Sequence, residues 1–280
     1  MKVGTVFWHR RGSSILDEFG FLYEAGFDGV EVTISEGLER EVLPFSARGY
    51  LRIESLREDV EELREASRDT GLEIHSVRGG LLWKYPLTSP NPNVRKKAEE
   101  IVCRGLRVAS QLGAATLLVV PGVVSEDMPY DEAYALALSA LRRLSRVAEE
   151  EDVSIGVENV GNNFLLSPLE MRDFVDGVGS EKVGVYLDVG NVLALRQAFP
   201  EHWIRILSRR IKKVHLKDYN RALKGVTYLL QGDVNWPKVI KGLKAIGYND
   251  YLTAEISPYR LFPELFFRDL AKTIRFLTEL

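Results

Sequence analysis

Four residues with metal-binding side chains recur at the ends of four strand-like segments in the second half of the chain. In each segment polar residues alternate with apolar ones, which is the pattern of a β-strand. The potential ligands lie on the polar side of each segment, near its C-terminal end, and they are Glu158, Asp188, His215 and Glu255. Three oxygen donors and one nitrogen donor suit one divalent metal ion, so we predict a single Mn, Co, Mg or Zn ion.

The four residues are separated by intervals of 30, 27 and 40 residues, each long enough for one strand and one helix. A single Glu, Asp or His at a strand end is also common as an ordinary polar residue of a loop-bearing face. Four of them on consecutive units favour a shared site. The spacing therefore predicts that strands five to eight of one sheet each contribute a ligand.

Strand-like and helix-like segments alternate along the whole chain, which is typical of a parallel α/β fold. Gly26, Gly71 and Gly113 follow three of the helix-like segments, and glycine is a favoured residue after a helix. The eight expected strands cover 2–8, 29–33, 72–77, 115–120, 153–159, 183–188, 211–218 and 251–256. Eight such units predict a single-domain (β/α)8 TIM barrel over residues 1–280, with a doubly wound open sheet as the second choice.

Longer connections interrupt this alternation at three places. We expect loops over 35–52 and 78–92, and a longer excursion over 219–235 before the seventh helix. Gly190, at the end of strand six, predicts a sharp exit from that strand. The basic residues within 209–213 enter strand seven from the end opposite to the ligands, so we expect them to form a solvated bottom face.

The composition of the chain limits the classes of molecule that the protein is expected to bind. The formal net charge of -3 provides no general attraction for nucleic acid or anionic lipid. No apolar run approaches the roughly 18 residues of a membrane span, and the N-terminal run is too short for a signal peptide. A single cysteine, Cys103, excludes an internal disulfide and a cysteine-based zinc site. We expect a cytoplasmic protein that binds a small polar molecule, without nucleic-acid or membrane partners; a homo-oligomer stays open.

The ligand-bearing segments V-E-N, L-D-V-G-N, V-H-L-K-D and A-E-I resemble the metal-binding strands of the xylose isomerase-like barrels. Within that superfamily the chain resembles the sugar-phosphate isomerase and epimerase branch, especially the ketose 3-epimerases and the L-ribulose-5-phosphate 3-epimerases. G-F-D-G-V-E-V, W-K-Y-P-L and Q-G-D-V-N-W add to the likeness, which spans most of the chain. The resemblance implies that the Glu, Asp, His and Glu named above hold one metal ion.

The resemblance also implies a reaction, the epimerisation of a ketose or ketose phosphate at C3. Inverting a carbon next to a ketone requires a proton to leave from one face and return to the other, so two acid/base groups are needed. Glu158 and Glu255 are the candidates, and a divalent ion would stabilise the charge of the enediolate intermediate. We therefore expect an isomerase, with a small sugar or sugar phosphate as its partner.

Further residues are candidates for binding the substrate. Arg221 follows His215 by six residues, as in the family's epimerases, and Asn191 stands where many epimerases of free sugars have a histidine. The full set of candidates is Asn191, Arg221, His75, Trp8 and Glu31. Core packing is the alternative for His75 and Trp8, and Glu31 could instead support a metal ligand.

Two questions stay open at this point, the phosphate and the reaction class. An anion could bind at the free amides of the first helix, and the basic and hydroxyl residues that could assist are Arg10, Arg11, Ser13, Ser14, Lys84 and Lys224. The alternative activities are an inosose-type dehydratase and an aldose-ketose isomerase, and a further alternative is a sugar-binding barrel without catalysis. The barrel also resembles endonuclease IV, but four histidines are too few for its three-zinc site.

Overall fold

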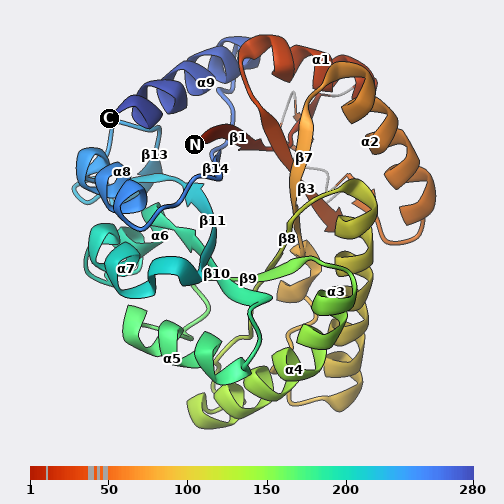
Figure 1. Ribbon diagram of the computed structural model, residues 1–280, viewed down its shortest axis with the longest axis vertical. Helices are drawn as coiled ribbons and strands as arrows, with labels where there is room; N and C mark the ends of the chain where they lie inside the picture. The colour runs from red at the N-terminus through yellow and green to blue at the C-terminus, as the bar shows by residue number, and fades with distance from the viewer. Residues whose placement is uncertain (11, 37–40, 43–44, 47–49) are drawn as a thin grey trace.

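The computed structural model describes residues 1–10, 12–36, 41–42, 45–46 and 50–280. Eight parallel strands form a closed barrel inside a ring of helices (Figure 1). In order around the barrel the strands are β1 (Lys2–Val6), β3 (Gly29–Ser35), β7 (Glu73–Arg78), β8 (Thr116–Val119), β9 (Ser154–Glu158), β10 (Val183–Asp188), β11 (Ile211–Leu216) and β14 (Tyr251–Ala254). Because β1 pairs with both β14 and β3, the sheet closes, which confirms the single-domain (β/α)8 barrel and excludes the open sheet.

Helices alternate with the barrel strands along the chain, as the sequence predicts. They are α1 (Ile15–Ala25), α2 (Leu56–Thr70), α3 (Pro92–Leu112), α4 (Tyr130–Glu150), α5 (Pro168–Val178), α6 (Val189–Ala194), α7 (Pro200–Leu207), α8 (Trp236–Ala245) and α9 (Pro263–Glu279). Gly26, Gly71 and Gly113 end α1, α2 and α3 with φ of 104°, 79° and 72°, a conformation that favours glycine. The expected sixth helix is in fact two helices, α6 and α7, followed by a 3-10 turn. Among the residues that the structure describes, no helix is both long and apolar enough to cross a membrane.

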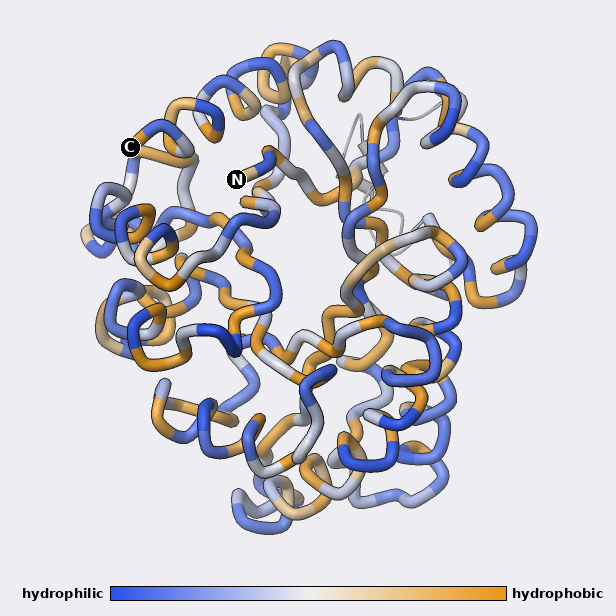
Figure 2. The backbone as a smooth tube through the Cα atoms, viewed as in Figure 1, coloured by the Kyte–Doolittle hydropathy of each residue, from blue (hydrophilic) through white to orange (hydrophobic). Residues whose placement is uncertain are grey.

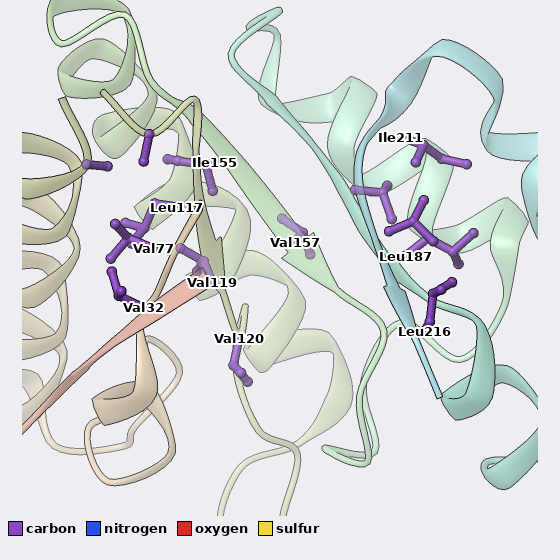
Figure 3. Close-up of a cluster of buried hydrophobic side chains, with 14 of the residues drawn as sticks. Val32, Val77, Leu117, Val119, Val120, Ile155, Val157, Leu187, Ile211 and Leu216 are labelled. Carbon is purple, nitrogen blue, oxygen red and sulfur yellow. The ribbon is translucent and has the colours of Figure 1, made fainter. Parts of the chain in front are cut away.

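The hydrophobic core lies between the barrel and the helices. Hydrophobic and hydrophilic segments alternate along the outer helices, as expected for helices with one buried face (Figure 2). Figure 3 shows side chains such as Val77, Leu117 and Ile155 gathered beside the strands. In β8, Leu117, Leu118 and Val119 are all at most 1% exposed, because a parallel strand is covered on both faces. This core fixes the directions in which the strands deliver their last residues.

Short strands occupy parts of the segments that the sequence assigned to loops. These strands are β2 (His9–Arg10), β4 (Glu41–Val42), β5 (Phe45–Ser46), β6 (Leu51–Arg52), β12 (Asp218–Asn220) and β13 (Gly225–Thr227). β5 pairs with both β2 and β4, and β6 extends the barrel sheet beside β3. β12 and β13 form an antiparallel hairpin within the expected excursion. The segment after β7 contains a 3-10 helix, Gly80–Trp83.

The buried carboxylate of Asp218 organises the excursion after β11. It accepts hydrogen bonds from the backbone N–H groups of Leu230 at 3.1 Å and Val234 at 3.1 Å, and from the indole N–H of Trp236 at 2.9 Å. Gly232 passes so close that an added Cβ would lie 2.2 Å from an Asp218 oxygen. The excursion is therefore anchored at its base, next to the end of β11.

One prediction about the bottom face is wrong. Lys213 was grouped with its basic neighbours as a solvated residue, but its side chain is only 2% exposed. Lys213 has the same parity along β11 as His215, so it points into the barrel. Its ammonium pairs with Asp250 at 2.8 Å, which explains how the charge is tolerated there.

Candidate metal centre

The four predicted ligands meet at the C-terminal end of the barrel. They lie on neighbouring strands or directly after them, since β9 pairs with β10, β10 with β11 and β11 with β14. One ligand atom from each of Glu158, Asp188, His215 and Glu255 lies within 4.8 Å of the others. This cluster can hold a metal ion.

Two of the converging atoms are buried and have hydrogen-bonding capacity to spare. His215 Nδ1 forms no hydrogen bond with any residue that the structure describes, and Asp188 Oδ2 has the ammonium of Lys217 beside it at 2.9 Å. His215 Nδ1 lies 3.6 Å from a Glu158 oxygen and 3.4 Å from Glu255 Oε2. Since buried polar atoms normally have partners, and these atoms converge on one point, the arrangement fits a divalent cation bound by oxygen and nitrogen donors.

Backbone contacts hold Asp188 in place. Its Oδ1 accepts a hydrogen bond from the N–H of Asn191 at 2.8 Å, which makes Asp188 the N-cap of α6. The side chain of Asn159 accepts from Asp188 N at 2.8 Å and donates to Asp188 O at 3.0 Å. With Oδ1 engaged in this way, Oδ2 is the oxygen left to face the other ligands.

Gly190 has a different role from the expected sharp exit of the strand. The chain passes from β10 directly into α6, and Gly190 lies within the first turn of that helix. A Cβ at this position would lie 2.5 Å from the Cβ of Lys217 and 2.8 Å from its carbonyl oxygen. Glycine is thus required by the close approach of α6 to the end of β11.

Glu31 supports His215 from inside the barrel. Its Oε1 lies 2.9 Å from His215 Nε2, and its Oε2 accepts hydrogen bonds from Tyr186 at 2.6 Å and Ser76 at 2.8 Å. Burial opposes ionisation of Glu31, but His215, Arg78 and Tyr186 hold its pKa below the usual value. By engaging Nε2, Glu31 orients the imidazole so that Nδ1 is available to an ion. The alternative role of Glu31, as a partner of a metal ligand, is the one that its contacts favour.

Two positively charged side chains at the metal centre, those of Lys217 and Arg78, were not predicted from the sequence. Lys217 Nζ lies 2.9 Å from Asp188 Oδ2 and 2.6 Å from Glu255 Oε2. The guanidinium of Arg78 pairs with the other oxygen of Glu255, and its Nε donates to Thr33 Oγ1 at 3.1 Å. Lys217 could have been found, because it has the same strand parity as His215 and stands two residues later. Arg78 was assigned to the start of a loop, whereas it is the last residue of β7.

The two glutamates of the cluster differ electrostatically. Burial raises the pKa of Glu158. Burial acts on Glu255 in the same sense, but the charges of Lys217 and Arg78 outweigh it and hold the pKa of Glu255 well below its usual value. For His215 burial opposes protonation, yet the neighbouring carboxylates, Glu31 first, raise its pKa to about 10. Without a bound ion, the imidazole is therefore protonated at neutral pH.

Asn191 and Arg221 lie in different surroundings from each other. The amide of Asn191 donates to the carbonyl oxygen of Asn159 at 3.0 Å, beside the cluster. Arg221 is exposed at the turn of the hairpin, where its guanidinium lies 5.4 Å from the ring centre of Phe199. The structure thus brings Asn191 to the metal ligands and leaves Arg221 outside their contacts.

His75 and Trp8 also occupy distinct positions. His75 is buried, stacks on Tyr251 with 3.9 Å between ring centres, and has its Nε2 3.2 Å from Thr253 Oγ1. This places His75 among packed side chains of the barrel interior, as its core alternative proposed. Trp8 is half-buried just after β1, and its buried indole N–H has no hydrogen-bond acceptor among the described residues. Trp8 thus keeps a free donor near the end of the barrel where the ligands converge.

Three of the six groups considered for a phosphate already have partners. Arg10 pairs with Glu18 at 2.7 Å and with Glu264 at 3.1 Å. Ser14 caps α1 by accepting from Asp17 N at 3.1 Å. Lys84 pairs with the carboxylate of Glu36, Ser13 is partly exposed and Lys224 is exposed in the hairpin, while Arg11 lies outside the described residues.

The chain was compared with known proteins. A family model described as xylose isomerase-like TIM barrel matches residues 19–279. D-psicose 3-epimerase from Enterocloster bolteae is 27% identical over 219 residues, which are 74% of this chain and 69% of that protein. L-ribulose-5-phosphate 3-epimerase UlaE from Salmonella heidelberg is 22% identical over 225 residues, covering 80% of this chain and 76% of the relative. The crystal structure of D-psicose 3-epimerase with D-tagatose from Clostridium cellulolyticum covers 100% of both chains with 17% identity and a TM-score of 0.79.

Proposed function

The chain belongs to the xylose isomerase-like TIM barrels, and from this premise we propose that it is a metal-dependent epimerase acting at C3 of a ketose or ketose phosphate. The two relatives described above are named as 3-epimerases of D-psicose and of L-ribulose 5-phosphate, which supports the reaction class. The proposal concerns the cluster at the C-terminal end of the barrel. Its central observation is the convergence of two glutamates, one at the end of β9 and one directly after β14, on the same imidazole.

Four side chains would hold the ion, and the set of ligand donors supports this assignment. They are Glu158, Asp188, His215 and Glu255. When bound, a divalent ion supplies Lewis-acid stabilisation of negative charge on the substrate's oxygens. Asn159 and Asn191 keep Asp188 oriented, and Glu31 keeps the imidazole of His215 in the tautomer whose Nδ1 can bind.

Glu158 and Glu255 would carry the proton. One carboxylate removes the proton from C3 to give an enediolate, and the other returns a proton to the opposite face. The two groups approach His215 Nδ1 at 3.6 and 3.4 Å from different strands, which supports their placement on two sides of one bound substrate. Arg78 and Lys217 hold the pKa of Glu255 below its usual value whereas burial raises the pKa of Glu158, so the two carboxylates are electrostatically distinct candidates for the two proton transfers.

The remaining contacts with substrate are proposed by position. Trp8, with a buried indole N–H that lacks an acceptor among the described residues, is the candidate for a hydrogen bond or a stacking contact with the sugar. Arg221 would have to turn away from Phe199 to reach the centre, so we assign it to the rim. His75 is not included among the proposed contacts, since it packs against Tyr251 inside the barrel.

The experiment is isotope labelling in deuterated water with a panel of pentuloses, hexuloses and their phosphates. An epimerase exchanges the C3 proton with solvent, so deuterium at C3 is the expected result. Elemental analysis of the same protein should find about one divalent ion per chain. Deuterium at C1 would indicate aldose-ketose isomerisation, a dehydrated product would indicate a dehydratase, and metal-loaded protein that labels no sugar would overturn the epimerase proposal in favour of a binding protein.

A further inference from the structure

Lys217 contacts the oxygens that would face a metal ion. Its ammonium lies 2.9 Å from Asp188 Oδ2, the oxygen that Asn191 leaves free, and 2.6 Å from Glu255 Oε2. Oε2 is also the Glu255 oxygen that approaches His215 Nδ1, since Arg78 holds the other one. The ammonium therefore bridges two carboxylates on the side where the ligands converge.

The position of Lys217 is fixed by packing as well as by charge. The first turn of α6 lies against the start of its side chain, and only a glycine at position 190 permits this approach. The side chain is 16% exposed, so water does little to screen its charge. Lys217 is thus a built-in cation of the centre, unlike a surface lysine that could turn away into solvent.

The charges around the centre can be counted through their contacts. The carboxylates in contact with His215, Arg78 or Lys217 are Glu31, Glu158, Asp188 and Glu255. When His215 is neutral, these four negative charges face only the two positive charges of Arg78 and Lys217. One divalent ion would balance the remaining two negative charges, and a buried site with balanced charge avoids a large desolvation cost. Without Lys217, the same ion would leave one negative charge uncompensated.

Resting on the proposed metal centre, we propose that Lys217 is a fixed counter-cation that shares Asp188 and Glu255 with the metal ion. A carboxylate oxygen has two lone pairs, so it can face an ion and an ammonium at the same time. Two cations that share the same oxygens repel each other strongly in a site with little water. Lys217 therefore makes the centre neutral with a single divalent ion and lowers its affinity for that ion.

The test compares the binding of Mn²⁺, measured by calorimetry, among variants of the full chain. Lys217→Met removes the charge but keeps a side chain of similar length, so it should bind Mn²⁺ at least about tenfold more tightly than wild type. Lys217→Arg keeps the charge and should bind within about threefold of wild type. Lys213→Met, the matched control, removes a buried lysine from β11, the strand that Lys217 directly follows, and should leave the Mn²⁺ affinity unchanged.

A second measurement separates a counter-cation from a residue that merely supports folding. In the presence of a chelator, Lys217→Met should melt at a lower temperature than wild type, because its carboxylates repel one another. Saturating Mn²⁺ should remove that difference, whereas Lys213→Met should stay less stable than wild type in both conditions.

The outcomes distinguish this inference from the proposed function. Unchanged or weaker Mn²⁺ binding by Lys217→Met, with wild type binding normally, would overturn the counter-cation role and leave the metal centre standing. Loss of stability in Lys217→Met that Mn²⁺ does not restore would also overturn it. If wild type bound no Mn²⁺, Co²⁺, Mg²⁺ or Zn²⁺, the metal centre itself would be wrong, and the role of Lys217 with it.

Discussion

The barrel contains two polar layers that differ in how their charges are compensated. In the lower layer, Lys213 pairs with Asp250 at 2.8 Å, and its ammonium lies 5.0 Å from the ring centre of Tyr251. The hydroxyl of Tyr251 donates to Glu73 at 2.7 Å. In the upper layer the potential metal ligands face one another, and two of them share the ammonium of Lys217.

Lys213 and Lys217 illustrate the difference, because Lys213 lies on β11, Lys217 directly follows it, and both ammonium groups contact carboxylates of the barrel. Lys213 forms an ion pair with one carboxylate, that of Asp250, at the base of the barrel. Lys217 is shared between two carboxylates that are also metal-ligand candidates. A lower layer whose charges are internally paired contributes stability, whereas an upper layer in which four potential metal ligands converge is arranged to bind something. Each of the following changes should affect one layer and spare the other.

The largest effect is expected from the proposed acid/base groups of the upper layer. Glu158→Gln and Glu255→Gln should each slow C3 epimerisation by about 10²–10⁴-fold, since an amide cannot accept the proton. Initial rates on the sugar identified by labelling provide the measurement. Glu73→Gln, in the lower layer, is the control and should keep the wild-type rate. Equal losses in all three variants would contradict the division into two layers.

A smaller effect, on Mn²⁺ affinity, is expected from Glu31, which contacts the proposed ligand His215. Glu31→Gln should weaken Mn²⁺ binding by about 10–100-fold, because the amide no longer provides the carboxylate that orients His215. Ser76→Ala removes only one hydrogen bond to Glu31 and should cost much less affinity. If calorimetry gave both variants the wild-type affinity, Glu31 would have no supporting role.

In the lower layer the expected loss is of stability. Lys213→Met should lower the free energy of unfolding by about 2 kcal/mol, below the range for a fully buried ion pair, because Asp250 is 39% exposed and remains hydrated. Denaturant titration measures this change. The affinity of Lys213→Met for Mn²⁺ should equal that of wild type, and a weakened affinity would show that the two layers are coupled.

The smallest effect is a pH dependence of stability that arises from His75. Burial, followed by the charge of Lys213, holds the pKa of His75 well below its usual value, so the folded protein keeps this imidazole neutral. The unfolded chain binds a proton there near pH 6.5. Below that pH the unfolded state binds the additional proton, so stability should fall as pH falls, by up to about 1.4 kcal/mol per pH unit.

His75→Phe keeps the ring that stacks on Tyr251 and should remove this acid sensitivity. Unfolding should be followed by denaturant titration between pH 7.5 and 5 in the presence of a chelator. In the metal-free protein His215 stays protonated throughout this range while its unfolded form titrates near pH 6.5, so His215 stabilises the fold as pH falls toward 6.5; this contribution is the same in wild type and His75→Phe and cancels in the difference between their slopes. An identical slope in wild type and His75→Phe would assign the acid sensitivity to other groups.

Local periodicity in the sequence was sufficient for the barrel and for the ligand candidates. Alternation along a strand determines which side chains share a face, and the closed order of parallel strands brings the ends of β9, β10, β11 and β14 together. Glu158, Asp188, His215 and Glu255 could therefore be predicted without knowledge of any long-range contact. The glycines that end α1, α2 and α3 are local signals of the same kind.

The partners of those ligands were decided by the tertiary structure. β3 and β7 pair with a shift in register, so that Val30 faces Ile74 but Glu31 faces Ser76, and His75 is the extra residue. This irregularity reverses the side-chain alternation along the rest of β7. It brings Ser76 to Glu31 and Arg78 to Glu255, and it leaves His75 stacked on Tyr251 in the lower layer. A register shift depends on the neighbouring strand, so the pattern of β7 alone could not reveal it.

The position of Lys217 depended in the same way on a distant segment. Its parity along β11 is visible in the sequence, but the carboxylates that it bridges come from the ends of two other strands. Arg221 shows the converse, because its spacing from His215 predicted a place at the centre while the hairpin directs it toward Phe199. The sequence by itself determined which residues a strand presents to the interior. Only the folded barrel decided which charges meet there, because electrostatic pairing depends on distances between strands that the local pattern does not contain.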